Sequence, residues 1–240
     1  GNQGQQFELL NSVTPEDATA FELNAFFHPE ASRKDGVGKL FIDRGAQKKV
    51  RLARNMATNE IVACAKVLAM SETELSELKL EINNQLSLPN NTLSLQLQDH
   101  ASIPMGDPDE YKGYLFMSLG KTSGSSAYKQ IPTLPTEIEK IEAFSKIAMQ
   151  LTESIGSLEN SGQIHQDIKP HNALLTNQDE WKLIDFGTLL STDQLQSTTK
   201  TEQYNDWSKK GTLEYLSPDC LTDEYFEHNE SILKKDAWAL

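Results

Sequence analysis

The sequence predicts an α+β protein, with a strand-rich first half and a mainly helical second half. Three observations support this class. Residues 38–70 consist of short β-prone segments separated by polar breaks. Capping boxes at Ser71–Glu74 and Thr136–Glu139 each precede apolar residues at helical spacing. After the second of these helices come short β-like pieces, at 172–175 and 181–184.

The composition narrows the classes of function. Among 240 residues, 35 Asp and Glu oppose 22 Lys and Arg, so the formal net charge is −13. Such an acidic chain is not expected to bind nucleic acid or an anionic membrane, because phosphates attract clustered Lys and Arg. No apolar run is long enough to predict a membrane span, and the first residues lack the pattern of a signal peptide. The two isolated cysteines, Cys64 and Cys220, favour a reducing compartment, so we expect a cytoplasmic protein.

The elements of the first half follow from these patterns. Residues 1–34 are expected to form an N-terminal extension with one short helix. The segment 38–70 predicts three antiparallel strands, and further strands are expected near 92–98 and 114–117. A helix is predicted over residues 72–87. Its apolar side consists of Leu75, Leu78, Ile82 and Leu86.

The second half opens with residues 118–135, whose glycines, serines and prolines predict a connector. Thr136 then begins the strongest helix of the sequence, which is expected to end near 160–162. Its apolar residues are Ile141, Phe144, Ala148, Leu151, Ile155 and Leu158. Residues 188–210 form a polar stretch rich in Ser and Thr, and 232–240 predict the start of another helix.

Two short segments of the second half carry the groups that phosphate chemistry needs. Residues 165–172 read His-Gln-Asp-Ile-Lys-Pro-His-Asn, and residues 185–187 read Asp-Phe-Gly directly after a β-like piece. Phosphoryl transfer from a nucleotide requires a carboxylate to orient the attacking hydroxyl and a cation to offset charge on the phosphoryl group. It also requires oxygen ligands that hold magnesium against the phosphates. The two segments supply all of these groups.

These segments resemble the eukaryotic-type protein kinase family, whose catalytic loop reads H-R-D-L-K-P-x-N and whose magnesium loop reads D-F-G. Residues 211–219 (GTLEYLSPD) resemble the end of the family's activation segment, and 236–240 (DAWAL) resemble the start of the buried helix that follows. The resemblance extends from about residue 38 to the end of the sequence. It implies a bilobal fold, in which an N-lobe and hinge over 35–120 hold an antiparallel sheet and one helix. A mainly helical C-lobe over 121–240 would be truncated after the start of the family's αF helix.

Carried over residue by residue, the resemblance implies roles for five side chains of the second half. Asp167 would be the catalytic base, Lys169 would contact the γ-phosphate, and Thr212 would bridge toward both. Asn172 and Asp185 would be the Mg²⁺ ligands. A Lys at position 169 points to Ser or Thr as the phosphorylated residue. The alternative is a loop in which these side chains only cap turns.

In the first half, the resemblance assigns Lys66, in the segment EIVACAK, to the α- and β-phosphates of the nucleotide. The alternative for Lys66 is a solvated charge on a strand. Its expected partner is Glu81, at the edge of the apolar side of the helix. Glu77, which lies further toward solvent on the same helix, is the alternative partner.

The nucleotide pocket also follows from the resemblance. Only Gly45 remains of the three glycines in the family's phosphate-binding loop, which predicts a weaker hold on the nucleotide. Val50 and Cys64 are expected to lie above the adenine and Leu174 below it, with Met117 as the gatekeeper. The hinge would consist of Ser118, Leu119 and Gly120. Cys64 is also expected to be buried and unreactive.

The function implied by the resemblance is that of an ATP- and Mg²⁺-dependent protein kinase that phosphorylates Ser or Thr of a protein substrate. The degraded glycine loop leaves a second hypothesis, a pseudokinase or nucleotide-binding scaffold that acts through a protein partner. A third hypothesis is a small-molecule kinase of the aminoglycoside type. That class shares the H-x-D-x-x-x-x-N spacing but typically lacks D-F-G.

Three further expectations concern regulation and context. Gln166 stands where the family has an Arg that receives an activation-loop phosphate, so we expect any activity to be independent of that phosphorylation. The sequence stops within the helix predicted at 232–240, so further chain or a partner protein is expected to complete the C-lobe. The divergent glycine loop and the trimmed end also fit a bacterial effector kinase delivered into a host cell.

Overall fold

The computed structural model describes residues 4–10, 41–44, 48–88, 95, 97–105, 110–197, 211–218 and 235–240. The chain forms two compact units. The first unit comprises Gly1–Leu86 and Leu95–Thr122, and the second comprises Ser87–Ser94 and Ser123–Leu240. The helix predicted within residues 1–34 and most of the polar stretch 188–210 lie outside the described residues.

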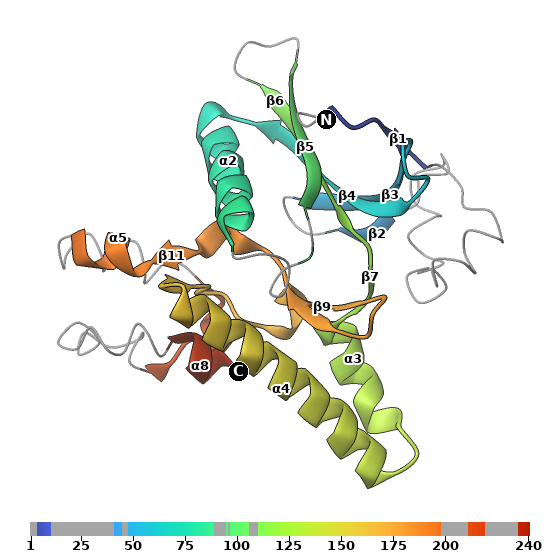
Figure 1. Ribbon diagram of the computed structural model, residues 1–240, viewed down its shortest axis with the longest axis vertical. Helices are drawn as coiled ribbons and strands as arrows, with labels where there is room; N and C mark the ends of the chain where they lie inside the picture. The colour runs from blue at the N-terminus through green and yellow to red at the C-terminus, as the bar shows by residue number, and fades with distance from the viewer. Residues whose placement is uncertain are drawn as a thin grey trace. The chain divides into compact units, whose positions relative to one another are not determined.

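The first unit is built on an antiparallel sheet in the order β1-β3-β4-β6-β5, with β2 also paired to β3 (Figure 1). The described strands are β1 (Phe7–Leu9), β2 (Phe41–Arg44), β3 (Lys48–Asn55), β4 (Ile61–Met70), β5 (Leu97–Pro104) and β6 (Tyr111–Ser118). The three strands predicted in residues 38–70 are confirmed as β2, β3 and β4. β1 is an additional strand from the N-terminal extension, and it pairs with the end of β3 that β2 leaves open.

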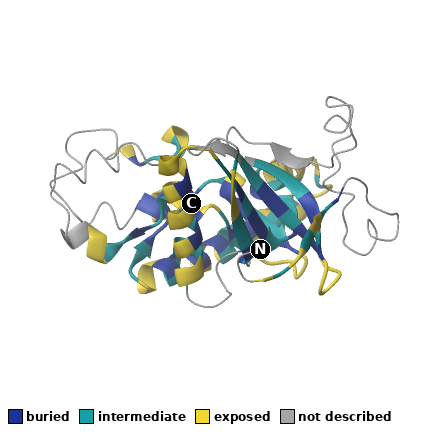
Figure 2. Cartoon of the chain, turned by 90° about the horizontal axis from the view of Figure 1, so that it is seen from above, coloured by how far each residue is buried: buried dark blue, intermediate teal, exposed yellow. Residues whose placement is uncertain are grey.

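The two faces of this sheet have different covers, because successive side chains of a strand point to opposite faces. On one face, Ala65, Leu97 and Leu115 pack with Leu75, Leu78 and Ile82 of helix α2 (Glu72–Ser87). We call this the α2 face. The opposite, outer face holds Ala53, Val62, Cys64 and Phe116. There the ring of Phe7 in β1 stacks on Phe116 with centroids 4.0 Å apart. Figure 2 shows the buried residues of the strands in dark blue.

Helix α2 begins as the sequence predicts. The Ser71 hydroxyl accepts a hydrogen bond from the Glu74 N–H at 3.3 Å, and the Glu74 carboxylate accepts one from the Ser71 N–H at 2.8 Å. These bonds satisfy two N–H groups at the helix start. The apolar stripe is shorter than predicted, because Leu86 is 52% exposed. In the same last turn, the Gln85 side chain instead donates to the Leu95 carbonyl at 2.7 Å.

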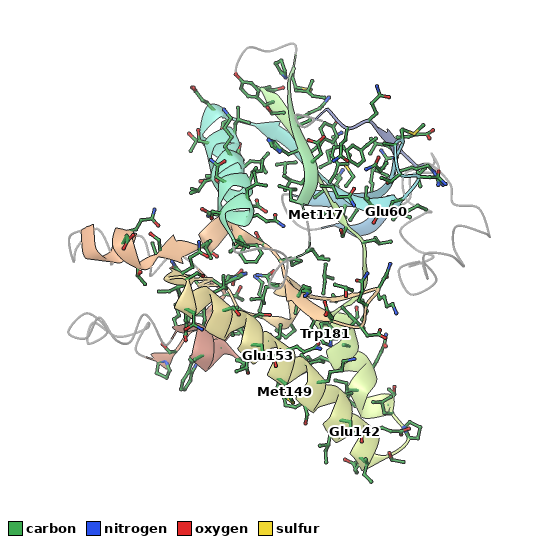
Figure 3. All side chains as sticks on the ribbon, viewed as in Figure 1. Glu60, Met117, Glu142, Met149, Glu153 and Trp181 are labelled. Atoms are coloured by element: carbon green, nitrogen blue, oxygen red, sulfur yellow. The ribbon has the colours of Figure 1, made fainter. Side chains whose placement is uncertain are left out.

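The second unit is organised by helix α4 (Glu137–Asn160), capped by Thr136 as predicted. Its buried side is made by Ile147, Leu151, Ser154, Ile155 and Leu158. The first part of the predicted stripe is wrong, because Ile141 is 63% exposed and Phe144 46% exposed. The apolar residues of α4 therefore begin closer to the start of the helix than the part that other described residues bury. Figure 3 shows Glu142, Met149 and Glu153 along this helix.

The connector predicted at 118–135 is structured instead. It contains β7 (Gly120–Ser123), helix α3 (Gly124–Gln130) and the 3-10 helix η2 (Ile131–Thr133). Ser123 caps α3 by accepting a hydrogen bond from the Ser126 N–H. A Cβ at Gly124 would lie 2.5 Å from the Pro170 carbonyl oxygen, so glycine is required for this close approach. The turn-forming residues therefore start a short helix rather than a loop.

The remaining elements of the second unit are short. They are β8 (Gln163–Ile164), η3 (Pro170–Asn172), β9 (Ala173–Thr176), β10 (Trp181–Leu183), η4 (Phe186–Thr188), β11 (Leu190–Ser191), α5 (Thr192–Ser197), η5 (Leu213–Tyr215) and α8 (Lys235–Ala239). β9 pairs with β10 and β8 pairs with β11, both antiparallel. The helix predicted at 232–240 corresponds to α8. No described helix combines the length and the apolar character needed to cross a membrane.

The capping box of α4 gives a stability prediction. Replacing Thr136 by Ala removes the oxygen that accepts the Glu139 N–H, and we expect the free energy of unfolding to fall by about 0.5–2 kcal/mol. The matched control is Thr152→Ala in the exposed middle of the same helix, where Ala is the better helix former. Urea unfolding followed by circular dichroism measures both. Equal effects of the two substitutions would contradict the capping role.

Candidate active site

The loop 165–172 of the second unit is held at its start by helix α8. Asp236 of α8 is only 1% exposed, and its carboxylate accepts hydrogen bonds from the backbone N–H groups of His165 and Gln166, the latter at 2.8 Å. Gln166 has a φ of 70°, a left-handed conformation that is unfavourable for a residue with a side chain. The two hydrogen bonds to Asp236 stabilise this conformation and so place the residue that follows, Asp167.

Asp167 is the centre of a closed hydrogen-bonded cluster, which we call the Asp167 cluster. The Lys169 ammonium donates to Asp167 Oδ2 at 2.7 Å and to Thr212 Oγ1 at 2.8 Å. The Thr212 hydroxyl donates to Asp167 Oδ1 at 2.8 Å. Asn172 Nδ2 donates to Asp167 Oδ2 at 2.9 Å and to the Asp167 carbonyl at 2.8 Å. Four side chains that the sequence singled out are therefore brought together, although Thr212 is 45 residues from Asp167.

The electrostatics of the cluster favour an ionised Asp167. Burial of this carboxyl group by itself raises its pKa. The hydrogen bonds from Lys169, Thr212 and Asn172, with the charge of Lys169, outweigh burial and lower the pKa below its ordinary value. Asp167 is therefore a carboxylate at neutral pH, with its oxygens oriented by three donors.

The Asp-Phe-Gly segment is anchored to the same loop. Phe186 is fully buried in the core of the second unit, and its ring centroid lies 5.0 Å from that of His165. The Thr188 hydroxyl donates to the His165 carbonyl at 2.7 Å. Asp185 is exposed and has a φ of 67°, so the chain turns sharply between strand β10 and the buried Phe186. This turn leaves the Asp185 carboxylate at the surface while its neighbour is fixed in the core.

Asn172 and Asp185 come from neighbouring strand ends. Ala173 of β9 lies opposite Leu183 of β10, and the Ile184 N–H donates to the Asn172 carbonyl at 2.9 Å. Asp185 therefore follows directly on the residue that lies opposite Asn172. The hairpin register brings the two expected metal ligands into one region of the second unit.

The donor set at this place suits Mg²⁺. The Asn172 Nδ2 group is engaged with Asp167, which leaves its amide oxygen as one candidate ligand, and the exposed carboxylate of Asp185 is the other. Mg²⁺ prefers such oxygens and completes its shell with water and nucleotide phosphates. No group of three His, Cys, Asp or Glu side chains able to hold a metal occurs in the described ranges.

In the first unit, the structure differs from the expected arrangement of the nucleotide residues. Val50 and Met117 pack on the α2 face, and Met117 is labelled in Figure 3. Cys64 belongs to the outer face, and Lys66 lies two residues further along the same strand. Val50 and Cys64 therefore do not share one face of the sheet, because Cys64 lies opposite Arg51 and Val50 lies opposite Ala65. Cys64 is 1% exposed, so the prediction of a buried thiol is confirmed, and burial raises its pKa to about 12, which disfavours the reactive thiolate.

The other residues expected at the nucleotide have the following positions. Glu81 is partly buried on α2, whereas Glu77 is exposed. Met117 and Ser118 end β6, and Leu119 and Gly120 are buried. Leu174 is partly buried in β9 opposite Lys182. Gly45 lies outside the described residues.

Two residues that matter for the loop were not identified from the sequence. Asp236 was assigned only to the start of a helix, and because it directly follows two lysines, its neighbours in the sequence do not signal its burial. Gly124 was read as part of a connector, yet it lies against Pro170 of the loop. Its contact depends on tertiary packing and has no local signal.

Comparisons with known proteins agree with this geometry. A family model described as "Protein kinase domain" matches residues 39–240. An Aurora kinase of Schizosaccharomyces pombe is 28% identical over 202 residues, which covers 83% of this chain and 50% of the relative. The serine/threonine-protein kinase TOS3 of Saccharomyces cerevisiae is 26% identical over 212 residues, covering 83% of this chain and 37% of the relative. The serine/threonine-protein kinase PKH1 of the same yeast is 38% identical over 98 residues, or 38% of this chain and 12% of the relative. The chain thus spans half or less of the length of these relatives.

Proposed function

This chain belongs to the protein kinase domain family, and on that basis we propose that it transfers the γ-phosphate of ATP to Ser or Thr hydroxyls of a protein substrate, with Mg²⁺ as cofactor. The observation that carries the proposal is the Asp167 cluster, in which a lysine and a threonine hydroxyl orient both oxygens of one carboxylate. Asp167 positions the substrate hydroxyl and accepts its proton. Lys169 offsets charge on the transferred phosphoryl group. Thr212, which accepts a hydrogen bond from Lys169, helps to hold the side chains of Lys169 and Asp167 in place.

The proposed magnesium ligands are Asn172 and Asp185. When bound, Mg²⁺ neutralises charge on the nucleotide phosphates. The role of the protein is to present one amide oxygen and one carboxylate from adjoining strand ends, with the amide fixed by its bond to Asp167. The fully buried Phe186 fixes the backbone from which the Asp185 carboxylate projects.

For the adenine of ATP we propose contacts with residues of the first unit. These are Val50, Met117 and the hinge residues Ser118, Leu119 and Gly120. The proposed partner of Lys66 is Glu81 of helix α2, which is less exposed than Glu77.

A second candidate function, a nucleotide-binding scaffold without transfer, is favoured by one observation. Of the three glycines in the family's phosphate-binding loop only Gly45 remains in the sequence, which weakens the hold on the nucleotide phosphates. Incubation of the chain with radiolabelled Mg-ATP and the proteins of a heat-treated lysate separates the two functions. Label on protein supports the kinase. Stabilisation by Mg-ATP in a thermal shift, without transfer of label, supports the scaffold.

The metal assignment gives a prediction of its own. Asp185→Ala removes one of two proposed Mg²⁺ ligands, and we expect transfer to fall by at least about 100-fold, as for loss of a positioned charged group at a transition state. Because residue 185 has a positive φ that strains Ala, Asp185→Asn is the better-matched variant, with a similar expected loss. Asp193→Ala, at an exposed position of α5, is the control. Full activity of both variants at position 185 would refute the assignment.

A further inference from the structure

Helix α3 lies against the loop 165–172 at Gly124. This glycine is buried at the start of α3, and a Cβ built on it would lie 2.5 Å from the Pro170 carbonyl oxygen. The same Cβ would lie 3.2 Å from the Pro170 Cα and 3.3 Å from the Ala173 Cβ. The Pro170 carbonyl also accepts the Ala173 N–H that ends the 3-10 helix η3. A side chain at position 124 would therefore overlap the backbone of η3 itself.

The point of contact lies between two of the groups that donate to Asp167. Pro170 follows Lys169, whose ammonium donates to Asp167 Oδ2 at 2.7 Å. Two residues further on, Asn172 Nδ2 donates to the same oxygen at 2.9 Å. The Asn172 N–H donates to the Lys169 carbonyl at 2.9 Å, so the turn at Pro170 links the two donors. A shift of Pro170 would consequently move both donors relative to Asp167.

Helix α3 is held in the second unit by contacts other than that of Gly124. Ala127 packs against the core cluster of this unit. The Tyr128 ring lies edge-on to the ring of Phe144 in α4, with centroids 5.9 Å apart. A residue larger than glycine at position 124 would therefore press on Pro170 from a helix that has its own anchors.

From these contacts we infer that Gly124 is a positioning residue for phosphate transfer. Because it has no side chain, α3 can lie against Pro170 while Lys169 and Asn172 keep their hydrogen bonds to Asp167. Gly124 acts through η3. The catalytic part of this inference rests on the function proposed above, whereas the effect on the hydrogen bonds of the Asp167 cluster stands without it.

The first test compares the full chain with Gly124→Ala and with the matched control Gly156→Ala in α4. A Cβ at position 156 has nothing within 4 Å, so the control adds the same methyl group without an overlap. With saturating radiolabelled Mg-ATP and lysate proteins as acceptors, we expect Gly124→Ala to lower the rate by about 10- to 100-fold, as for a small misplacement of catalytic groups. The control should stay within about twofold. A parent-like rate in Gly124→Ala would overturn the inference.

A second measurement separates positioning from a general loss of stability. Nitrogen-15 NMR follows hydrogen exchange of the Asn172 side-chain amide, and the Trp181 N–H, which donates to Gln150 in the same unit, is the reference. In Gly124→Ala we expect exchange at Asn172 to be at least about tenfold faster relative to the reference, because its hydrogen bonds to Asp167 are displaced. Equal acceleration at both groups would overturn the positioning role.

A second variant relieves the overlap from the side of the helix. Phe144→Ala removes the ring that Tyr128 contacts, so α3 can withdraw from Pro170. We expect Gly124→Ala/Phe144→Ala to transfer phosphate at least about threefold faster than Gly124→Ala, a non-additive effect of coupled residues. A further loss of rate, or failure of both variants to fold, would overturn the inference. If the parent chain transfers no label, the proposed function fails, and the exchange at Asn172 still decides the role of Gly124.

Discussion

Replacing Asp167 by Asn is expected to lower the rate of phosphate transfer by about 10²–10⁴-fold, the contribution of a positioned general base. Asparagine keeps the volume of the side chain and removes its charge. The amide nitrogen of the new asparagine is a donor and cannot accept a hydrogen bond. It would face other donors, because Lys169, Thr212 and Asn172 all donate to the carboxylate of the parent chain. The rate is measured as incorporation of radiolabel from Mg-ATP into lysate proteins.

The matched control for this substitution is Asp179→Asn in the turn between β9 and β10. Residue 179 has a φ of 59°, a conformation that Asn tolerates, and it lies in the same unit. We expect this variant to keep the parent rate within about twofold. Nucleotide affinity should be little changed in Asp167→Asn, because the carboxylate acts on the substrate hydroxyl. Transfer at the parent rate by Asp167→Asn would show that another group is the base.

Replacing Asp236 by Ala is expected to have the largest effect on stability. The carboxylate is buried and accepts hydrogen bonds from the backbone N–H groups of His165 and Gln166. Its removal leaves two buried donors without an acceptor, at a cost of about 1–3 kcal/mol each. We therefore expect the free energy of unfolding to fall by about 2–6 kcal/mol in urea. Transfer should also fall in the folded fraction, because the left-handed Gln166 loses its support.

The control on the same helix is Trp238→Ala, since Trp238 is 59% exposed. Its effect should be within about 1 kcal/mol despite the larger change in volume. A second variant, Asp236→Asn, keeps one acceptor oxygen and should lose roughly half as much stability as Asp236→Ala. If Asp236→Ala and Trp238→Ala have equal effects, the anchoring role of Asp236 is wrong.

Local signals explain which parts of the fold were predicted from the sequence. The starts of α2 and α4 were predicted because a capping box is a contact within four residues. The strands β2, β3 and β4 were predicted because β-prone segments alternate with polar breaks. The exposure of Leu86 and Ile141 was not predicted, because apolar spacing shows which side of a helix is apolar but does not show how far its cover extends.

The residues of the candidate site also fall into those that a local signal identifies and those that only distant contacts explain. Asp167, Lys169 and Asn172 lie within six residues of one another, so one segment identifies them. Asp236 lies in helix α8, about 70 residues along the chain from the loop residues whose N–H groups donate to it. Its role therefore has no local signal. The face of Lys66 depends on the register of β4 with β3 and β6, and a one-residue change in register reverses it.

The sequence by itself determined the family-like motifs, the two capped helices and the chemical groups available for phosphate transfer, because each is a pattern within a few neighbouring residues. Only the tertiary structure decided that Asp236 holds the loop and that Lys66 projects to the outer face. It also gave the geometry of the bridge that the resemblance implied, in which Thr212 bonds to Asp167 and Lys169. These facts depend on contacts between segments distant in sequence and on strand register. Such contacts arise from packing of the whole unit, and no short stretch of chain contains them.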